Sequence, residues 1–555
     1  MPILVSNQKS KINMILIDII FLTLSLGSLF FILLGVRPLW VPDEGRYAEI
    51  IREMLNSGNL VTPYLNGIKY FEKPPLFYWL GSIAVKLIGL NIWSIRSINA
   101  LLGLLGCLIT YWTGYRLYNR RLGLFAAFIL GTSTLYFVMT EMISLDLTIT
   151  FFLTFCLYSF LLATQESNAG KRLFYISLSA AAAGCAVLTK GLIGILFPGL
   201  IIGIWLSLSK QWRVLKQLYL PSSLLIFLII VIPWHLLVQK QNPEFFYFYF
   251  IEQQFLRYTT LNIGHYQPVW YFIPILIIGF FPWVVFLPQM FYQNFVNRKN
   301  LTTVNLFFLT WIVFIFIFFS FSKSKLIPYI LPIFPALAML TANYLVTIKE
   351  RCLGIAIGSV TLVIFSIIIA SLFYYYSRHA TLPDPSHTKI FLTLAGIILI
   401  LGNSYGAYIL FQKKRLMAIY LIIATTWLFL FTTLMAIPAI DTRSIRSLAQ
   451  YLKPLLKTQD VIITYNQYFQ DLPFYLERRV VILNWQNELT FGMQHQNTQG
   501  WMIDNRDFWQ YWNSSKLIYV IMSKDEYGQF KKNHLQIHPH LLAETMTNVL
   551  ISNQQ

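Results

Sequence analysis

Carboxylates and amines that could do chemistry are grouped in two short motifs between residues 42 and 79. The first motif, residues 42–58, begins Pro-Asp-Glu-Gly-Arg-Tyr. Pro42 and Asp43 are helix-start signals, Gly58 is a helix-stop signal, and apolar residues recur between them at helical spacing. This apolar stripe consists of Tyr47, Ile50, Ile51, Met54 and Leu55. We therefore expect an amphipathic helix with Asp43 in its first turn.

Asp43 supports two interpretations. It falls on the same helix face as Tyr47 and Ile50, at the end where the helix dipole favours an ionised carboxylate, so it could act as an anionic base. Alternatively, Asp43 only caps the helix and Glu44 is a solvated charge. The helix by itself favours the capping role.

The second motif, residues 65–79, reads Leu-Asn-Gly-Ile-Lys-Tyr-Phe-Glu-Lys-Pro-Pro-Leu-Phe-Tyr-Trp. Glu72 and Lys73 lie between aromatic residues and a Pro-Pro stop, which holds a carboxylate and an ammonium group in place without helical freedom. Lys73 could bind a phosphate, and Glu72 could ligate a divalent cation or position an acceptor. The alternative is a local ion pair in which Lys73 extends to water.

The composition shows that these motifs belong to a protein that needs a bilayer as its solvent. Of its 555 residues, 56% are hydrophobic and only 12% are charged, which is more apolar than a soluble chain of this size can bury. A net charge of +19 would suggest nucleic acid in a soluble protein. Here the enrichment of Lys and Arg in cytoplasmic loops of membrane proteins explains the charge, so we expect no nucleic-acid partner.

About thirteen segments are apolar and long enough to span a bilayer, for which roughly 20 residues are needed. They are residues 14–35, 97–115, 122–140, 145–164, 173–189, 191–209, 219–238, 269–289, 304–322, 326–347, 353–375, 390–412 and 416–437. The stretch from Leu76 to Leu90 is shorter and contains Lys86, so we assign it to the membrane interface. With this count all the basic short loops fall on one side, which must be the cytoplasm.

The tail from Pro438 changes character. Runs typical of strands, residues 461–465, 479–485 and 516–522, alternate with helix-compatible stretches and predict a small α/β domain on the outer face. We therefore predict an all-α polytopic membrane domain, residues 1–437, that includes a first outer loop, residues 36–96. An extracytoplasmic α/β domain, residues 438–555, follows. The protein is expected in the plasma (inner) membrane, with an active site that faces the periplasm or exterior.

Further charged residues lie at span ends on the predicted outer side: Asp146, Lys190, Glu252, Arg257, Lys323 and Lys325. Each by itself is more typical of an ordinary loop charge. Together they place carboxylates and cations around one outward cavity next to lipid, where a lipid phosphate is the natural ligand of the cations. The four cysteines form no CxxC pair, and no Walker loop or GxGxxG motif indicates a nucleotide donor.

Residues 42–58 and 65–79 together resemble the lipid A aminoarabinose transferases of the protein mannosyltransferase superfamily, which has the GT-C fold. Asp146, Arg257, the segment 325–335 and the tail sequence Asp-Leu-Pro-Phe-Tyr-Leu from Asp471 extend the resemblance over nearly the whole chain. The resemblance implies transfer of a sugar from a polyprenyl-phosphate carrier, with inversion at the anomeric carbon. It also favours a functional role for Asp43.

The resemblance implies roles residue by residue. Catalytic roles fall to Asp43, Glu72 and Asp146, and substrate-binding roles to Glu44, Tyr47, Lys73, Arg257, Lys323 and Lys325. Glu72 resembles a contact to a divalent metal ion or to the acceptor, and Lys73 and Arg257 resemble ligands of the carrier phosphate. Relatives often carry a histidine just before that arginine, where this chain reads Glu252-Gln-Gln-Phe-Leu-Arg257. This difference puts a metal site that uses the histidine in doubt.

The predicted function is therefore sugar transfer from a polyprenyl (undecaprenyl) phosphate carrier to an acceptor on the outer face, with transfer of 4-amino-4-deoxy-L-arabinose to lipid A as one candidate. A protein or glycan glycosyltransferase that uses a polyprenyl-phosphate-mannose type of donor stays open, because these motifs do not identify the acceptor. The expected partners are the donor, a lipid A, protein or glycan acceptor, and membrane lipids. A secondary transporter is the alternative from another class, and it should show inverted repeats and charges near the bilayer midplane.

Overall fold

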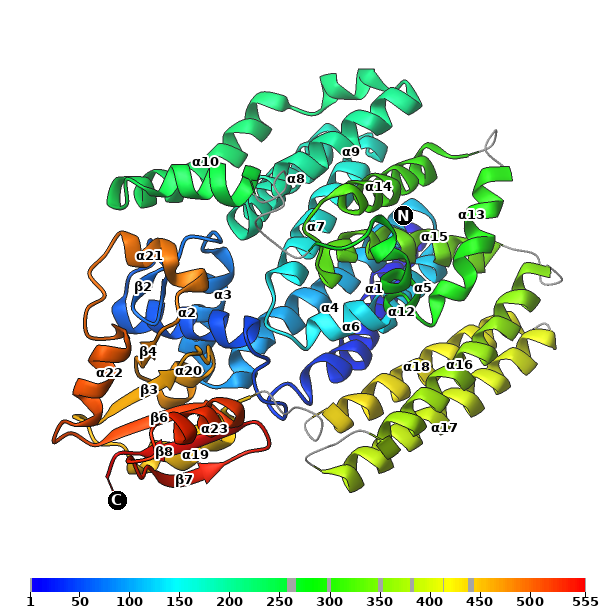
Figure 1. Ribbon diagram of the computed structural model, residues 1–555. Helices are drawn as coiled ribbons and strands as arrows, with labels where there is room; N and C mark the ends of the chain where they lie inside the picture. The colour runs from blue at the N-terminus through cyan, green and yellow to red at the C-terminus, as the bar shows by residue number, and fades with distance from the viewer. Residues whose placement is uncertain are drawn as a thin grey trace. The chain divides into compact units, whose positions relative to one another are not determined.

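The computed structural model describes residues 2–256, 266–296, 301–347, 353–379, 384–412, 414–437 and 444–554. The chain forms two compact units (Figure 1). The first, here called the helical unit, comprises residues 1–34, 96–380 and 386–436. The second, here called the α/β unit, comprises residues 35–95, 381–385 and 437–555.

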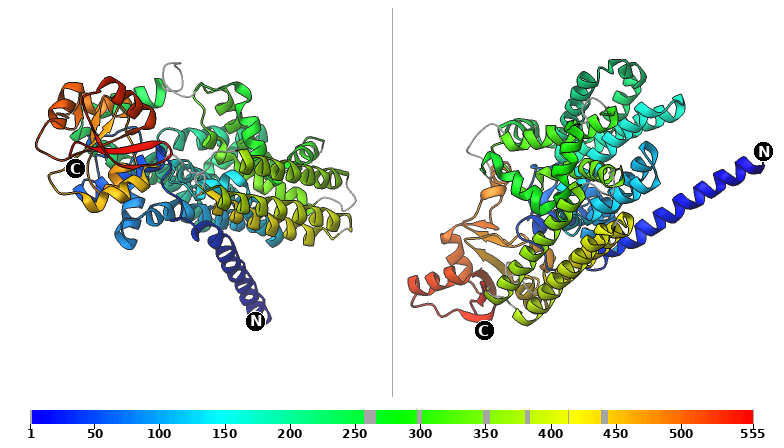
Figure 2. Two further views of the ribbon diagram at one scale, coloured as in Figure 1. Left: turned by 60° about the horizontal axis from the view of Figure 1, so that its bottom comes forward. Right: turned by 90° about the vertical axis from the view of Figure 1, so that its right-hand side faces the viewer.

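The described part of the helical unit is built mainly from apolar helices, some long enough to span a bilayer and some short. They are α1 (Pro2–Phe31), α4 (Ile92–Leu117), α5 (Arg120–Thr132), α6 (Thr134–Thr140), α7 (Leu145–Gln165), α8 (Ala169–Lys190), α9 (Ile193–Ser209), α10 (Leu220–Gln241), η2 (Tyr247–Leu256), α12 (Phe272–Gly279), η4 (Trp283–Phe286), α13 (Leu287–Val296), α14 (Thr303–Phe321), η6 (Ile327–Ile333), α15 (Phe334–Thr347), α16 (Leu353–His379), α17 (Pro385–Phe411) and α18 (Arg415–Ala436). Figure 2 shows α1 as one continuous helix.

All of the predicted spans coincide with helices, but not every span is one straight helix. In the described residues, 10 helices are long and apolar enough to cross a membrane, or up to 12 if each of two bent pairs is one span. The pairs α5 with α6 and α12 with α13 bend by 69° and 108°. The predicted span 269–289 is therefore broken into two helices, because a helix cannot continue through Pro282 without losing a backbone hydrogen bond. The segment 191–209 forms α9, which has 17 residues.

Helix ends that were predicted to share a side of the membrane contact each other. Bonds join the ends that carry basic loops: Arg116 to Glu166 (Nη2 to Oε2, 3.0 Å), Arg120 to Asp18 (Nη2 to Oδ1, 2.6 Å) and Arg415 to the Val346 carbonyl (3.0 Å). At the other ends, the Asn99 amide donates to the carbonyl oxygens of Met142 (2.5 Å) and Ser144 (2.8 Å). These contacts agree with the alternation of spans predicted from the loops.

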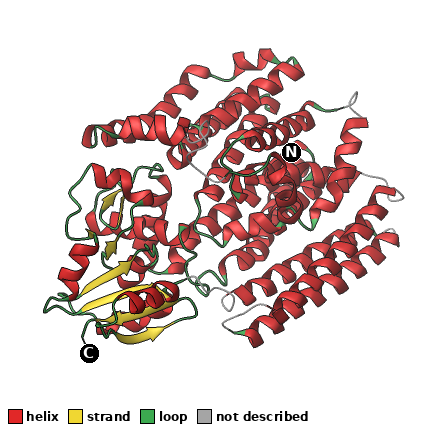
Figure 3. Cartoon of the chain, in the orientation of Figure 1, coloured by secondary structure: helices red, strands yellow, loops and turns green. Residues whose placement is uncertain are grey.

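The α/β unit contains every named strand of the described chain (Figure 3). Its strands are β1 (Tyr64–Leu65), β2 (Ile68–Lys69), β3 (Val461–Tyr465), β4 (Val481–Leu483), β5 (Met502–Ile503), β6 (Ile518–Ser523), β7 (His540–Glu544) and β8 (Asn548–Ser552). Its helices are α2 (Asp43–Ser57), α3 (Leu76–Ile88), α19 (Arg446–Leu452), α20 (Leu472–Leu476), η9 (Asn487–Leu489), α21 (Thr490–Gln494), α22 (Asn505–Trp512) and α23 (Lys524–Asn533). The three strands predicted in the tail are confirmed as β3, β4 and β6.

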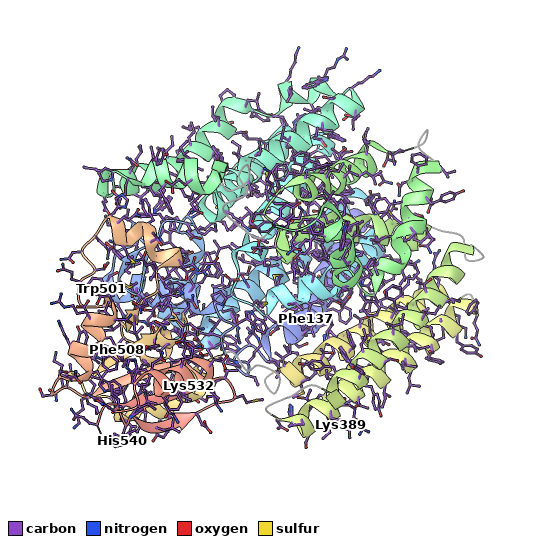
Figure 4. The ribbon with its side chains drawn as sticks, viewed as in Figure 1. Phe137, Lys389, Trp501, Phe508, Lys532 and His540 are labelled. Carbon is purple, nitrogen blue, oxygen red and sulfur yellow. The ribbon has the colours of Figure 1, made fainter. Side chains whose placement is uncertain are left out.

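The main sheet has the order β5-β4-β3-β6-β8-β7. β3 pairs in parallel with β4 on one side and with β6 on the other, whereas β8 is antiparallel to β6 and to β7. Helices α22 and α23 contribute Phe508, Trp512 and Phe530 to a core that also contains Val520 and Ile551 of the sheet. Figure 4 labels Phe508, whose ring lies 5.4 Å from that of Tyr465 between ring centroids. This core makes the tail a folded support for the loops at the strand ends.

The first outer loop folds together with the tail, whereas the sequence grouped it with the membrane domain. The Asn66 side chain donates to the Val480 carbonyl oxygen (2.9 Å) and accepts from the Val480 amide (3.0 Å). The Gln496 side chain likewise accepts from the Lys69 amide (2.9 Å) and donates to the Gly67 carbonyl oxygen (2.8 Å). Because these bonds satisfy backbone groups of the β1–β2 hairpin, the loop and the tail form one structural unit.

Gly45 marks a close approach between α2 and the tail. A methyl group at this position would lie 2.5 Å from the Asp471 amide nitrogen and 2.7 Å from the Gln470 carbonyl carbon. Since both atoms belong to the backbone, Gly45→Ala is expected to lower the free energy of unfolding of the α/β unit by about 1–3 kcal/mol. Thermal unfolding of purified protein in detergent would measure this change.

Gly528 is the matched control for Gly45. It lies in α23, and a methyl group there would meet no heavy atom within 4 Å. Gly528→Ala should therefore leave the midpoint of thermal unfolding unchanged or raise it, because alanine stabilises a helix by about 0.5–1 kcal/mol relative to glycine. Equal midpoints for Gly45→Ala and wild type would contradict the close approach.

Candidate active site

Asp43 begins α2 but does not cap it. No side-chain capping bond is present at this helix start, and the Asp43 side chain is 58% exposed. Its carboxylate instead accepts a hydrogen bond from the Arg46 guanidinium one turn later (Oδ1 to Nη1, 3.2 Å). The helix from Asp43 to its left-handed stop at Gly58 is confirmed, and the purely capping role of Asp43 is not.

Arg46 connects Asp43 to a buried carboxylate from the tail. The second guanidinium nitrogen, Nη2, forms an ion pair with Glu488, which also accepts from the Gln470 amide (3.0 Å). Burial raises the pKa of Glu488, although the nearby Arg46 opposes this shift. A buried ion pair of this kind positions its members because leaving either charge alone would be costly. Arg46 is thus held where it can orient Asp43.

Two buried tyrosine hydroxyl groups lie near the same charges. Neither Tyr70 nor Tyr78 has a hydrogen-bond partner for its hydroxyl group among the residues that the structure describes. Burial, followed by the charge of Glu72, raises the pKa of Tyr70 well above its usual value. Burial also raises the pKa of Tyr78, so both groups stay protonated donors at neutral pH. Unpaired buried donors of this kind are often satisfied by a ligand or water.

Glu72 and Lys73 lie on the bend that joins β2 to α3, and both side chains are half-buried. Pro74 and Pro75 follow, and α3 begins immediately afterwards at Leu76. Because proline fixes the backbone angle φ, the two side chains are presented from a rigid turn. This confirms that no helix carries them. The assigned contacts of Glu72 with metal or acceptor and of Lys73 with phosphate stay predictions.

Glu44 does not fit the substrate-binding role that we predicted for it. Its side chain is fully buried and forms a bidentate ion pair with Arg37 (2.6 and 3.0 Å). One carboxylate oxygen also accepts from the Trp40 backbone amide (2.7 Å). Glu44 therefore anchors the segment before α2, whereas its neighbour Asp43 is exposed.

Tyr47 packs among aromatic side chains of the α/β unit, next to Arg46. It is only 9% exposed, and its ring centroid lies 6.1 Å from that of Phe77 and 6.2 Å from that of Tyr78. The Arg46 guanidinium lies 6.0 Å from the Tyr47 centroid. Tyr47 thus supports Arg46 and Tyr78, and its predicted contact with substrate stays a prediction.

Asp146 and Lys190 form a second charged group, in the helical unit. Ser144 caps α7 by accepting from the Asp146 amide (3.0 Å), which places Asp146 in the first turn of this helix. The Asp146 carboxylate forms an ion pair with Lys190 at the end of α8. The Lys190 ammonium also lies 4.6 Å from the ring centroid of Tyr329, within reach of a cation–π contact. Asp146 therefore holds Lys190 in a defined position.

Lys323 and Lys325 differ in their surroundings although both were predicted to bind substrate. Lys323 is exposed. Lys325 is only 3% exposed, and its ammonium donates to the Gln267 carbonyl oxygen (2.7 Å). Burial lowers the pKa of Lys325. Lys323 is therefore the better placed of the two to meet a ligand, and Arg257 lies outside the described residues.

The described residues offer no ready metal site. They contain no group of three or more His, Cys, Asp or Glu side chains that could hold a metal ion. Glu72 as a metal ligand accordingly stays a prediction.

The Arg46–Glu488 pair makes a prediction about stability and its pH dependence. Arg46→Met leaves Glu488 buried without its cation and is expected to lower the free energy of unfolding by about 3–5 kcal/mol. The pKa of Glu488 should then rise further above that of an unfolded glutamate. Because a raised pKa stabilises the fold only while the group is protonated, the loss should be smaller at acidic pH and grow towards neutral pH.

Thermal unfolding of Arg46→Met in detergent at acidic and neutral pH would test this pair. Arg46→Met/Glu488→Leu is the matched control, because it removes both charges and should recover much of the stability. A loss in Arg46→Met that the second change does not reduce would contradict the pairing.

Two residues of these groups, Arg46 and Glu488, were absent from the predicted site, and Lys190 was predicted near it without a role of its own. Arg46 follows Asp43 at helical spacing, so its sequence position could have indicated the pair. Lys190 stands out as a charge in a tight turn between two apolar helices. Glu488 shows no such signal, because its partner comes from the other end of the chain.

Comparisons with known proteins identify two families along the chain. Residues 15–249 match the dolichyl-phosphate-mannose-protein mannosyltransferase family, and residues 448–553 match the aminoarabinose transferase C-terminal domain. The chain is 34% identical over 408 residues to the undecaprenyl phosphate-alpha-4-amino-4-deoxy-L-arabinose arabinosyl transferase 1 of Proteus mirabilis, with 70% of this chain and 71% of that protein covered.

Other relatives carry the same description. The transferase from Enterobacter sp. (strain 638) is 34% identical, with 58% of each chain covered, and that from Shewanella sediminis is 28% identical, with 89% of this chain and 90% of that protein covered. In several of these alignments the chain spans about six tenths of the relative's length (58%, 60% and 57%).

Solved structures agree with these alignments. ArnT from Cupriavidus metallidurans bound to undecaprenyl phosphate is 28% identical and superposes with a TM-score of 0.85 over 96% of this chain and 98% of that chain. Its apo state superposes with a TM-score of 0.84 over 96% and 97%. The chain therefore belongs to the undecaprenyl phosphate-alpha-4-amino-4-deoxy-L-arabinose arabinosyl transferase family.

Proposed function

We propose that this protein transfers 4-amino-4-deoxy-L-arabinose from undecaprenyl phosphate to lipid A at the outer face of the inner membrane. The observation that carries the proposal is the likeness, over 96% of the chain, to a structure of ArnT bound to undecaprenyl phosphate. The helical unit supplies the spans of a multi-pass membrane protein. The family supports this donor.

An apolar groove in the helical unit supports a polyprenyl donor. A cavity of about 700 Å³ is lined by α9, by α14 from Leu306 onwards and by Ser322, which directly follows α14, with Ile204, Val313 and Phe318 among its side chains. The groove follows nearly the full length of α14 and ends next to Lys323. An isoprenoid chain could therefore lie along α14 with its phosphate near a cation, as apolar burial and charge pairing both favour.

The proposed reaction is a single displacement at the anomeric carbon of the sugar. An acceptor oxygen forms a new bond to this carbon while the bond to the carrier phosphate breaks, and undecaprenyl phosphate leaves. Lys73 stabilises the charge that develops on the leaving phosphate, and Arg257 keeps its predicted role as a second phosphate ligand. Asp43, oriented by Arg46, takes the proton of an acceptor hydroxyl. If the acceptor is a phosphate of lipid A, Asp43 positions it without proton transfer.

The test is release of undecaprenyl phosphate by purified protein in nanodiscs. Donors that carry aminoarabinose or mannose are each supplied with lipid A, with a peptide or with a lipid-free glycan, and Lys73→Ala serves as the inactive control. The proposal expects release only from the aminoarabinose donor together with lipid A. Release from the mannose donor with peptide or glycan would instead establish a protein or glycan glycosyltransferase, and absence of release from folded wild type would overturn both.

A further inference from the structure

A second cavity lies within the α/β unit, at the carboxyl ends of its parallel strands. Its volume is about 660 Å³, and its walls include residues that follow β3, β4 and β6 and residues of the turn between β7 and β8. Gln467 and Tyr468 follow β3, Trp485 follows β4, and Ser523 and Lys524 end β6 or follow it. None of these residues belongs to the site predicted from the sequence.

The sheet topology makes this position a natural binding site. From β3 the chain adds β4 and then β5 on one side, and it later returns to add β6 on the other side of β3. The loops after β3 and β6 therefore diverge and leave a crevice between them. Open α/β sheets bind their ligands outside the carboxyl ends of the strands at such a switch point.

The lining suits an uncharged polyhydroxylated ligand better than a phosphate. The loop after β3 contains no glycine that would let backbone amides cradle a phosphate. The Lys524 ammonium lies 3.4 Å from the Glu544 carboxylate, and Asp525 also lines the cavity, so the walls carry no excess of positive charge. Amide side chains, Gln467 and Asn487 among them, offer both donors and acceptors, as neighbouring sugar hydroxyl groups require.

Trp485 provides an aromatic surface in the same wall. It is half-buried, and its ring centroid lies 5.4 Å from that of the buried Tyr468, which supports it from below. An aromatic face held in this way can pack against the C–H face of a sugar ring while the amides bind its hydroxyl groups. Aromatic and amide groups in one crevice therefore indicate a saccharide.

The cavity is connected to the Asp43 group by residues of the α/β unit. Val41 and Pro42 line the cavity and directly precede Asp43. Gln470, also in its wall, donates to Glu488, which pairs with Arg46, the residue that contacts Asp43. A saccharide bound in the cavity would therefore lie close to Asp43, the residue that the proposed reaction assigns to the acceptor.

We propose that this cavity binds the saccharide part of the acceptor and contributes to acceptor specificity. That the bound saccharide is the acceptor rests on the proposed function, whereas saccharide binding itself can be measured without any donor. In this proposal Trp485 is the main contact to the saccharide, and Gln467 is a second one. Because the Gln467 side chain is exposed, replacing it leaves the packing of the core unchanged.

The binding experiment uses the full chain in nanodiscs and isothermal titration calorimetry with hexosamine and hexose disaccharides that carry neither lipid nor phosphate. Wild type should bind at least one of them, and Trp485→Ala and Gln467→Ala should weaken that binding about tenfold and severalfold. Trp501→Ala is the matched control. The Trp501 ring centroid lies 4.5 Å from the Arg479 guanidinium elsewhere in the unit, so this variant should bind the disaccharides like wild type. Absence of binding by wild type, or equal weakening in Trp501→Ala, would overturn the proposal.

Turnover separates the acceptor role from saccharide binding alone. With the undecaprenyl-linked donor, Trp485→Ala and Gln467→Ala should raise the KM for acceptor and leave the KM for donor unchanged. An unchanged acceptor KM in both variants would overturn the acceptor role. Saccharide binding by a wild type that shows no turnover would support the site and refute the proposed function, so the two failures are distinguishable.

Discussion

Replacing Lys73 with alanine is expected to lower the turnover of undecaprenyl-phosphate-linked sugar by about 100- to 1000-fold. Lys73 is presented from a rigid Pro-Pro turn, and in the proposed reaction its ammonium meets the charge that develops on the leaving phosphate. Removing one preorganised electrostatic contact to such a charge typically costs a factor of about 10²–10³ in rate. Steady-state release of undecaprenyl phosphate would measure the loss.

The Lys73 prediction has a control in the same segment. Lys86 is an exposed cation in the last turn of α3, so Lys86→Ala removes one positive charge from the α/β unit without touching the Pro-Pro turn. Its turnover should match that of wild type. Lys73→Arg should retain part of the activity, because it keeps the charge but changes the shape of the donor group. Wild-type turnover in Lys73→Ala would refute its assignment to phosphate.

Replacing Asp146 with asparagine is expected to lower kcat/KM by about 100-fold. The Asp146 carboxylate holds the Lys190 ammonium beside the ring of Tyr329, and an amide cannot supply the charge that fixes this position. A displacement of about 1 Å in a positioning group can cost about 10²-fold in rate. Asp146 acts here through Lys190, so Asp146→Asn and Lys190→Met should have similar effects and the double variant should add little.

The opposite end of the same helix provides the control for Asp146. Glu166 directly follows α7 and pairs with Arg116 at 3.0 Å, so Glu166→Gln breaks an ion pair of the same kind at the end predicted to face the cytoplasm. The kcat/KM of Glu166→Gln should stay close to that of wild type. The midpoint of thermal unfolding should change by a similar amount in Glu166→Gln and in Asp146→Asn. If Asp146→Asn and Glu166→Gln reduced kcat/KM equally, the effect would be structural, and the positioning role would be wrong.

Local patterns predicted the elements that carry the site. The amphipathic period and the signals at Pro42 and Gly58 located α2 almost to the residue, and strand-like runs located β3, β4 and β6. Span length and basic loops located the helices, because each of these signals depends on residues close together in the chain. The bend of 108° after α12 was missed, since apolar length by itself does not distinguish a straight span from a broken one.

Neighbouring carboxylates show what local patterns could not distinguish. Asp43 and Glu44 occupy adjacent positions and have the same charge, yet Asp43 is exposed and Glu44 is fully buried against Arg37. A helix start specifies only that acidic residues are favoured there. Which of them faces solvent depends on the segment that packs against the helix.

Composition and residue spacing were enough to establish that the chain needs a bilayer, where its helices lie, that its tail is an α/β domain and which charged motifs could do chemistry. The ion pairs of Glu488 with Arg46 and of Lys190 with Asp146, and the cavity beside Trp485, emerged only from the folded structure. Periodicity and composition report the face that a residue presents. An ion pair or a crevice depends on which distant segment covers that face.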